Sequence, residues 1–184
     1  MRCVRRLFLL GAVLLCCTPS WVQAADAPEE PETDPLRERA AADDPKAQLE
    51  LGFSYFQGIG RKANATRAAY WFDRAARHGL PQAQYNLALC CQEGLGVEFN
   101  RHRAFELLQQ AAKQELPEAQ LLLADYYLNG ITAEPDAKPP RHAVAPDFPA
   151  GIALLQKLAA ANHVAAQRNL ALAWLRHPEP DVRE

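Results

Sequence analysis

The sequence repeats itself with a period of 36 residues, and this feature constrains the fold most strongly. The segments that begin at Ala47, Ala83 and Ala119 read AQLELGFSYFQGIG, AQYNLALCCQEGLG and AQLLLADYYLNG. A fourth copy, AQRNLALAWL, begins at Ala166, which is 47 residues after the third. Units of this length bury their apolar faces by stacking on one another, so we expect a solenoid in which each repeat contacts its neighbours.

A second pattern alternates with the first and predicts that each repeat is a helical hairpin. It reads AAYWFDRAARHG from Ala68, AFELLQQAAKQE from Ala104 and GIALLQKLAAAN from Gly151. Both patterns place apolar residues three and four apart, and glycines follow the first pattern, as in helices separated by turns. In the first helix of each hairpin, small and large residues share one face, which lets a neighbouring helix approach closely. These positions are Ala47, Leu51, Gly52 and Tyr55, then Ala83, Leu87, Ala88 and Cys91, then Ala119, Leu123, Ala124 and Tyr127.

This residue pattern resembles that of the Sel-1-like repeat family, a relative of the tetratricopeptide repeat. The resemblance covers about residues 45 to 175. In the first unit it rests also on Gly58, Gly60, Trp71, Phe72, Ala75, Ala76 and Gly79, and in the second on Gly94, Gly96, Ala111 and Ala112. The chain departs from the family pattern at Cys91, which replaces an aromatic residue, and at Thr132, where a glycine is expected.

We therefore predict an all-α fold, a right-handed α/α superhelix of Sel-1-like helical hairpins. The solenoid is expected to span residues 36–177, with repeats at 45–80, 81–116 and 117–163, a C-terminal capping helix at 164–176 and a tail at 178–184. The third repeat carries an 11-residue insertion within 131–147. Its prolines 135, 139, 140 and 146 interrupt a helix, so we expect this segment to project as a loop.

The N-terminal segment 1–24 has the features of a secretory signal peptide. Three arginines precede an apolar run from Leu7 to Cys17, and Val22-Gln23-Ala24 fits a cleavage site before Ala25. The apolar run is shorter than the roughly 20 residues that span a bilayer. Residues 25–35, ADAPEEPETDP, are acidic and proline-rich and lack large apolar side chains, so we expect them to be disordered.

Charge argues against a nucleic-acid partner. The whole chain has 20 Lys and Arg against 22 Asp and Glu, and loss of the three leader arginines lowers the formal net charge from −2 to −5. An acidic protein lacks the basic surface that binds phosphate backbones. The mature chain keeps only two of five cysteines, the adjacent Cys90 and Cys91, which excludes a network of disulfides.

The sequence carries no catalytic motif, so we expect neither catalytic residues nor a cofactor. It lacks G-x-S-x-G, H-E-x-x-H, C-x-x-C and a phosphate-binding glycine loop, and its five histidines lack the i, i+4 spacing of a helical metal site. We therefore expect no metal. Some cysteine-rich members of the family are associated with penicillin binding or β-lactamase activity. An enzyme acting on cell-wall or β-lactam substrates, with Cys90 or Cys91 as nucleophile and His102 as base, stays open as a third hypothesis.

Solenoids offer an extended concave surface that can bind a peptide or helix of a partner protein. We expect it to be lined by the positions of the first helices that lie outside the repeat pattern. The candidates are Glu50, Phe53, Ser54, Asn86, Leu89, Cys90, Leu122, Asp125, Tyr126, Asn169 and Leu172. The insertion, with Lys138, Arg141 and His142, forms a second candidate surface on an otherwise acidic protein.

These observations predict a non-enzymatic protein that is exported to a bacterial periplasm. The resemblance implies an adaptor or scaffold that binds another envelope protein through its concave face, with no stable membrane span after signal cleavage. An alternative within the binding class is an immunity protein that neutralises a secreted toxin effector, because its acidic charge suits a basic toxin surface.

Overall fold

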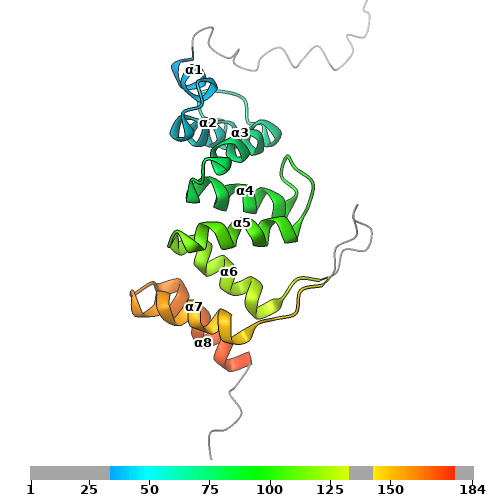
Figure 1. Ribbon diagram of the computed structural model, residues 1–184, viewed down its shortest axis with the longest axis vertical. Helices are drawn as coiled ribbons and strands as arrows, with labels where there is room; N and C mark the ends of the chain where they lie inside the picture. The colour runs from blue at the N-terminus through cyan, green and yellow to red at the C-terminus, as the bar shows by residue number, and fades with distance from the viewer. Residues whose placement is uncertain (1–33, 133–142, 177–184) are drawn as a thin grey trace, which may run out of the picture.

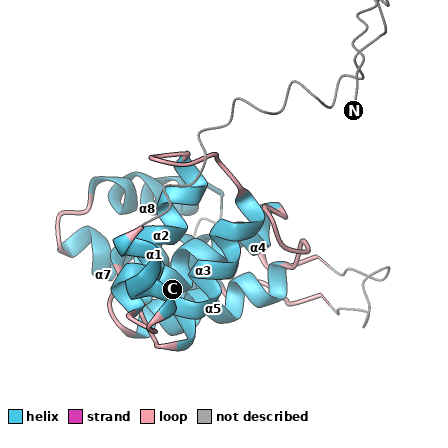
Figure 2. Ribbon diagram, turned by 90° about the horizontal axis from the view of Figure 1, so that it is seen from above, coloured by secondary structure: helices cyan, strands magenta, loops and turns pink. Residues whose placement is uncertain are grey.

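The computed structural model describes residues 34–132 and 143–176, and within them the chain is a stack of α-helices (Figure 1). The helices are α1 Pro35–Ala41, α2 Pro45–Gln57, α3 Ala65–Arg77, α4 Pro81–Glu93, α5 Arg101–Lys113, α6 Pro117–Asn129, α7 Phe148–Ala160 and α8 Val164–Arg176. They follow one another along the long axis in chain order, and Figure 2 shows the loops that join them. The predicted all-α solenoid of helical hairpins is confirmed.

The first helices of the three complete repeats begin with proline, and their second helices begin with a side-chain cap. Pro45, Pro81 and Pro117 occupy the first turns of α2, α4 and α6, where proline has the right φ and needs no N–H. Asn64 and Asn100 accept hydrogen bonds of 2.9 Å from the amides three residues later in α3 and α5. Asp147 does the same for α7, and these caps satisfy amides at the helix starts.

Two glycines end the first helices in equivalent ways. Gly58 after α2 and Gly94 after α4 have φ of +74° and +68°, the left-handed region that other residues rarely adopt. The chain then turns back on the preceding helix, because Asn64 N donates to Tyr55 O and Asn100 N donates to Cys91 O, each over 2.8 Å. These glycines therefore allow the chain to reverse direction between the two helices of each hairpin.

The core runs along the stack because each helix packs mainly against the helices that precede and follow it in the chain. Most of the small and large residues that the repeat pattern predicts on one face lie in this core, and Ala47, Leu51, Leu87 and Cys91 are at most 1% exposed, whereas Tyr127 is half-buried. Ala124, Leu155, Leu158, Ala166 and Ala173 form a separate cluster at the C-terminal end. Burial is thus shared between neighbouring repeats, as in other solenoids.

A glutamine follows the first alanine of every copy of the first pattern, and three of the four contact the end of the preceding helix. Gln48, Gln84 and Gln120 are buried, whereas Gln167 is exposed. Gln48, Gln120 and Gln167 donate from Nε2 to the carbonyl oxygens of Ala40, Ala112 and Ala159, over 3.2, 3.1 and 3.3 Å. These carbonyls lie at the ends of α1, α5 and α7, where each also accepts a hydrogen bond from the backbone N–H three residues later. Gln84 instead exchanges hydrogen bonds with Gln110 and Gln114.

The end of the predicted disordered segment differs from the structure. Residues 25–33 lie outside the described residues, but α1 starts at Pro35, and Asp34 caps it by accepting from Leu36 N over 3.1 Å. Asp34 also pairs with Arg61 over 2.9 Å, with both side chains largely buried, and the Arg61 guanidinium lies 4.8 Å from the centre of the Tyr55 ring. The prediction missed this ion pair because its partners lie 27 residues apart.

The described ends of the insertion are held together by an isolated antiparallel bridge. Ile131 and Val144 exchange two backbone hydrogen bonds of 2.9 Å, and Asp147 N donates to Tyr127 O over 2.7 Å. Ile131 is 3% exposed and joins the core, whereas Val144 is 37% exposed. Among the described helices none is long and apolar enough to cross a bilayer.

Candidate partner-binding groove

Three successive first helices form a groove that contains four of the eleven predicted groove residues. It holds about 340 Å³ between α4, α6 and α8. Its lining consists of Tyr85, Leu89, Glu118, Leu121, Leu122, Asp125, His163 and Asn169. Leu89, Leu122, Asp125 and Asn169 come from three different helices, so the stacking of the repeats brings them together.

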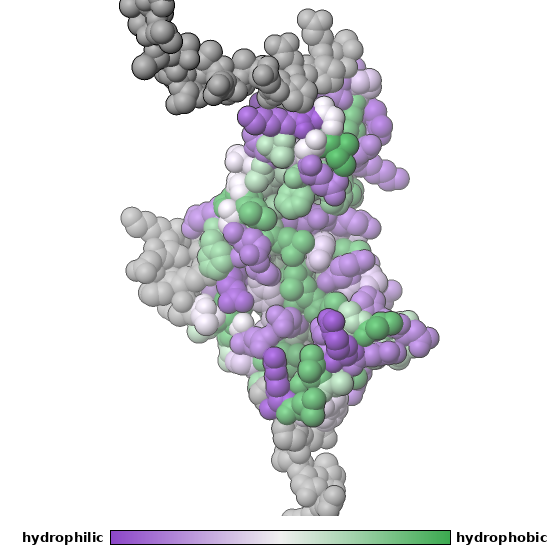
Figure 3. Space-filling view, turned by 180° about the vertical axis from the view of Figure 1, so that it is seen from behind, coloured by the Kyte–Doolittle hydropathy of each residue, from purple (hydrophilic) through white to green (hydrophobic). Residues whose placement is uncertain are grey.

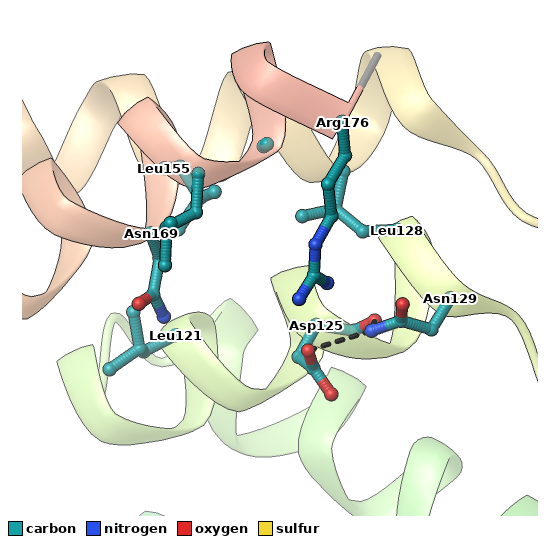
Figure 4. A pocket seen from close by; sticks show the side chains of 9 residues that line it. Leu121, Asp125, Leu128, Asn129, Leu155, Asn169 and Arg176 are labelled. Carbon is teal, nitrogen blue, oxygen red and sulfur yellow. Dashed lines mark hydrogen bonds between the residues drawn. The ribbon is translucent and has the colours of Figure 1, made fainter.

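A second hollow of about 180 Å³ continues this groove between α6 and α8 (Figure 4). It shares Leu121, Asp125 and Asn169 with the first and adds Leu128, Asn129, Leu155, Leu172, Ala173 and Arg176. In Figure 4, Arg176 reaches down from α8 toward Asp125 on α6. We call the two hollows together the first-helix groove.

The first-helix groove combines an apolar floor with carboxylates. Leu89, Leu121 and Leu122 supply the apolar surface, while the exposed Glu118 and Asp125 supply negative charge. Asp125 Oδ1 accepts a hydrogen bond of 2.8 Å from Asn129 Nδ2, which holds the carboxylate at the rim. The groove therefore suits a segment that carries apolar side chains together with a basic group.

Tyr85 contributes a phenol to the same surface. Burial raises the pKa of this phenol, and the nearby Glu118 carboxylate raises it further. The hydroxyl thus stays protonated at neutral pH and can donate a hydrogen bond to a bound segment.

The first repeat contributes no residue to these two hollows. Glu50 is exposed on α2, whereas Phe53 is half-buried and packs edge-on against Phe72, with ring centroids 5.3 Å apart. Asn86 on α4 donates from Nδ2 to Gln82 O over 2.6 Å, so its amide is engaged within its own helix. The three predicted residues Glu50, Phe53 and Asn86 therefore lie outside the first-helix groove.

The prediction for Tyr126 is wrong. Tyr126 is 4% exposed, donates from its hydroxyl to Gln92 Oε1 over 3.1 Å, and lies under the Arg101 guanidinium at 5.6 Å. Its position in the repeat faces the preceding repeat, and Cys90 and Ala173 at equivalent positions are also buried. The side chain fills the contact between repeats and is not available to a partner.

Several lining residues were not predicted from the sequence. Tyr85 and Leu121 occupy equivalent repeat positions, one residue before Asn86 and Leu122, so the periodicity offered a signal for them. Glu118 and His163 lie near the starts of α6 and α8, and only the packing of the helices brings them to the groove. The predicted insertion residues Lys138, Arg141 and His142 lie outside the described residues.

A larger hollow of about 600 Å³ lies among α5, α6 and α7 and involves no predicted residue. Its lining includes Lys113, Glu115, Leu123, Tyr127 and Lys157. Lys157 Nζ donates to Glu115 Oε1 over 2.9 Å, an exposed ion pair that joins the turn before α6 to α7. The hollow is lined by the second helices α5 and α7 together with the first helix α6, and the sequence analysis treated second helices as packing elements.

Burial works against a cysteine nucleophile. Cys90 and Cys91 are free thiols at most 2% exposed. Burial, aided by the neighbouring Cys91, raises the pKa of Cys90 to about 11, and burial also raises the pKa of Cys91. A thiol attacks as the thiolate, so both are poorly reactive at neutral pH. In the described part of the chain, no three His, Cys, Asp or Glu residues are grouped to hold a metal ion.

Comparison with known proteins places the repeats in a family. The family pattern described as Sel1 repeat matches residues 45–80, 81–116 and 117–163, which is more than half of the chain. No curated protein sequence matches the chain significantly.

Two solved structures are similar in fold and sequence. A Sel1 repeat protein from Oxalobacter formigenes is 31% identical with a TM-score of 0.60, and the match covers 74% of this chain and 94% of that one. A protective antigen present in uropathogenic Escherichia coli strains, which displays an SLR fold, is 28% identical with a TM-score of 0.66. That match covers 77% of this chain, which spans only 28% of the antigen.

Proposed function

This chain belongs to the Sel1 repeat family, whose repeats mediate protein–protein interactions, and from that premise we propose an exported adaptor or scaffold that binds an envelope protein in the periplasm. Binding takes place in the first-helix groove. The protein acts without catalysis, as a surface that holds a partner.

One observation carries this proposal: the repeats bring leucines of α4 and α6, two carboxylates of α6 and the amide of Asn169 on α8 into one groove. Leu122 lies on α6, the middle of the three helices, with Leu89 on α4 and Asn169 on α8. Apolar anchors surrounded by polar side chains are typical of protein-binding surfaces. The partner segment is therefore expected to present a leucine-like side chain to the floor and a lysine or arginine to Asp125 and Glu118.

Capture of the partner from an envelope extract tests the groove. The variant Leu89→Glu with Leu122→Glu should lose the partner that the wild-type chain retains, because two charges would enter the apolar floor. Ile59→Glu is the matched control, since Ile59 is 63% exposed in the loop after α2 and does not line the first-helix groove. Equal capture by the double variant and the control would exclude the groove as the binding surface.

The nature of the captured protein separates the two proposed roles. An envelope protein such as a secretion or polysaccharide component supports the adaptor. A secreted toxin with a basic surface, whose activity the chain suppresses, supports the alternative that the chain is an immunity protein.

Export is proposed because residues 1–24 have the features of a secretory signal peptide. The chain produced in a bacterial host should appear in the periplasmic fraction with Ala25 as its N-terminal residue, which mass spectrometry would show. A protein that keeps Met1 and stays in the cytoplasm would contradict export without affecting the groove.

A further inference from the structure

The hollow among α5, α6 and α7 lies where the second and third repeats meet, and an equivalent hollow of about 290 Å³ lies where the first and second repeats meet (Figure 1). We call them the second and the first junction hollow, and the second is the larger, at about 600 Å³. A step of 36 residues relates α3 to α5 and α4 to α6, and a step of 47 residues relates α5 to α7. By these steps, four repeat positions line both hollows: Asp73, Arg77, Leu87 and Arg103 in the first, and Gln109, Lys113, Leu123 and Ala150 in the second.

Polar side chains bridge the first junction. Arg103 on α5 reaches back to α3, where its guanidinium donates to Asp73 Oδ1 over 2.7 Å. Arg77 pairs with the other oxygen of the same carboxylate, also over 2.7 Å. One carboxylate therefore holds two arginines, one of its own helix and one of the next second helix.

The second junction lacks this bridge. Ala150 stands at the position of Arg103, and Gln109 stands at the position of Asp73. The smaller side chain at position 150 accounts for the larger hollow. Lys113 has an amide instead of a carboxylate one helical turn before it, and its side chain pairs with no carboxylate in the described part of the chain. The second junction hollow thus combines free space with a cation that has no counter-charge.

Polar atoms and apolar side chains line the second junction hollow together. Gln120 is 4% exposed and donates to Ala112 O over 3.1 Å, while its Oε1 accepts no hydrogen bond from a described residue. The equivalent glutamine of the first junction, Gln84, bonds to two glutamines of α5 instead. The Tyr127 hydroxyl accepts from Gln109 Nε2 over 3.4 Å and can donate to a ligand. The apolar part of the lining is formed by Ala112, Leu123, Ala150, Ala153 and Leu154.

Charge, rather than apolar surface, indicates the occupant. Figure 3 shows hydrophobic residues among hydrophilic ones along the stack, so apolar surface is not particular to one site. The charged residues that line the second junction hollow are Lys113, Glu115 and Lys157. Glu115 and Lys157 pair with each other over 2.9 Å, which leaves the Lys113 ammonium for a ligand. A carboxylate would pair with it as Asp73 pairs with Arg77, whereas a cationic ligand would be repelled.

We propose that the second junction hollow binds an acidic segment of a partner protein, which supplies the carboxylate that the first repeat carries itself. A glutamate or aspartate of the segment pairs with Lys113, and an apolar side chain beside it lies against Leu123 and Leu154. A backbone N–H of the segment donates to Gln120 Oε1, the acceptor that the junction leaves unused.

This surface is separate from the first-helix groove. On α6 the second junction hollow uses Gln120, Leu123 and Tyr127, whereas the groove uses Glu118, Leu121, Leu122, Asp125, Leu128 and Asn129. With 3.6 residues per turn, the two sets lie on opposite sides of the helix. The groove presents carboxylates and the hollow presents an ammonium, so an adaptor of this kind can hold a basic segment and an acidic segment at once.

Fluorescence anisotropy of a labelled peptide tests the charge. The probe is an acetylated heptapeptide with glutamate on both sides of a central leucine and glycine and serine elsewhere, and its twin carries glutamine in place of glutamate. We expect the purified chain to bind the glutamate peptide at least about tenfold more tightly than the glutamine peptide. Lys113→Gln should abolish this difference, and Lys113→Arg should keep it. Lys62→Gln, the same loss of charge in the loop after α2, is the matched control and should also keep it.

Transfer of the first junction into the second tests the site. The double variant Gln109→Asp with Ala150→Arg places the Asp73 and Arg103 pair of the first junction in the second junction hollow. The chain then fills the space and supplies the carboxylate itself. We expect this variant to bind the glutamate peptide at least about tenfold more weakly than the unchanged chain, with the same helical circular dichroism spectrum.

Several results would overturn the proposal. One is equal binding of the two peptides by the unchanged chain, and another is an unchanged preference for glutamate in Lys113→Gln. Tighter peptide binding after replacement of residues 133–142 by two glycines would show that the chain's own insertion is the occupant. A chain that sediments as a dimer and becomes monomeric with Lys113→Gln would show that the occupant is a second copy. Loss of partner capture through Leu89 and Leu122 leaves these results unchanged, so the two proposals fail separately.

Discussion

The close approach of Phe72 to Gly52 predicts that the sizes of these two side chains are coupled: a larger residue at position 52 requires a smaller one at position 72. Gly52 on α2 has no side chain, and the Phe72 ring of α3 occupies the place where a Cβ would lie. In the second repeat the same two positions hold Ala88 and Leu108. Alanine is larger than glycine and leucine is smaller than phenylalanine, so the two changes in size compensate. The double change Gly52→Ala with Phe72→Leu should therefore be milder than its two parts suggest.

The expected magnitudes follow from packing. Gly52→Ala gains about 1 kcal/mol in helix propensity but forces the ring to move, which costs about 1–3 kcal/mol in a packed core. The ring is 1% exposed and also packs against Phe53, so it has little room to shift. Phe72→Leu alone leaves a cavity and should cost about 1–3 kcal/mol. In the double variant the new methyl group enters that cavity, and we expect a coupling free energy of at least about 1 kcal/mol in its favour.

Urea denaturation followed by far-UV circular dichroism measures each free energy of unfolding, with a constant m-value as the check on a two-state transition. The reverse exchange, Ala88→Gly with Leu108→Phe, is the matched control in the second repeat and should show coupling of the same sign. The reasoning is refuted if the losses of the single variants add within about 0.5 kcal/mol, or if Gly52→Ala alone is stabilising.

Three further predictions concern stability and reactivity. Gln120→Met should lower the free energy of unfolding by about 0.5–1.5 kcal/mol, because the Ala112 carbonyl loses the 3.1 Å hydrogen bond from Gln120 and keeps the one from Glu115 N. Gln156→Met, at an exposed position of α7, should have no measurable effect. Native Cys90 should react slowly with iodoacetamide at pH 8, faster as the pH approaches 11, and at once after unfolding; rapid labelling of the native chain, detected by mass spectrometry, would contradict its burial. The pKa of Asp43 lies below its ordinary 3.8, chiefly because Gln48 donates to its carboxylate, so this contribution to stability is present above pH 4 and is lost as the pH falls through the lowered pKa. In Asp43→Asn the free energy of unfolding should therefore fall less between about pH 4 and pH 2 than in the unchanged chain. An equal fall in both chains, measured by thermal unfolding at each pH, would argue against the contact.

The sequence was a good guide where the structure depends on local order. The repeat step of 36 residues, the turn glycines Gly58 and Gly94 and the start of the last helix near Val164 could all be predicted, because hairpin geometry is set by residues close in the chain. The periodicity also placed Leu89 and Leu122 on a common surface, which the groove between α4, α6 and α8 contains.

Contacts between distant residues were not predictable in the same way. Tyr126 and Tyr127 are neighbours with the same side chain, yet Tyr126 is buried and Tyr127 is half-buried. The repeat pattern assigned burial to the second of them, and the contact of Tyr126 with Gln92 reverses the order. Such a reversal depends on the rotation of α6 against the preceding repeat, which no single helix encodes.

The amino-acid sequence by itself determined that this protein is a stack of helical hairpins, because helix periodicity and turn residues act over a few positions and recur at a fixed step. Only the tertiary structure decided which surfaces remain open. It joined α4, α6 and α8 into one groove, left the first repeat out of it, and exposed Ala171 where Gly52, Ala88 and Ala124 are covered. The physical reason is that the exposure of a residue depends on its neighbours: the same residue pattern forms a core when a second helix packs over it and an exposed face when none does.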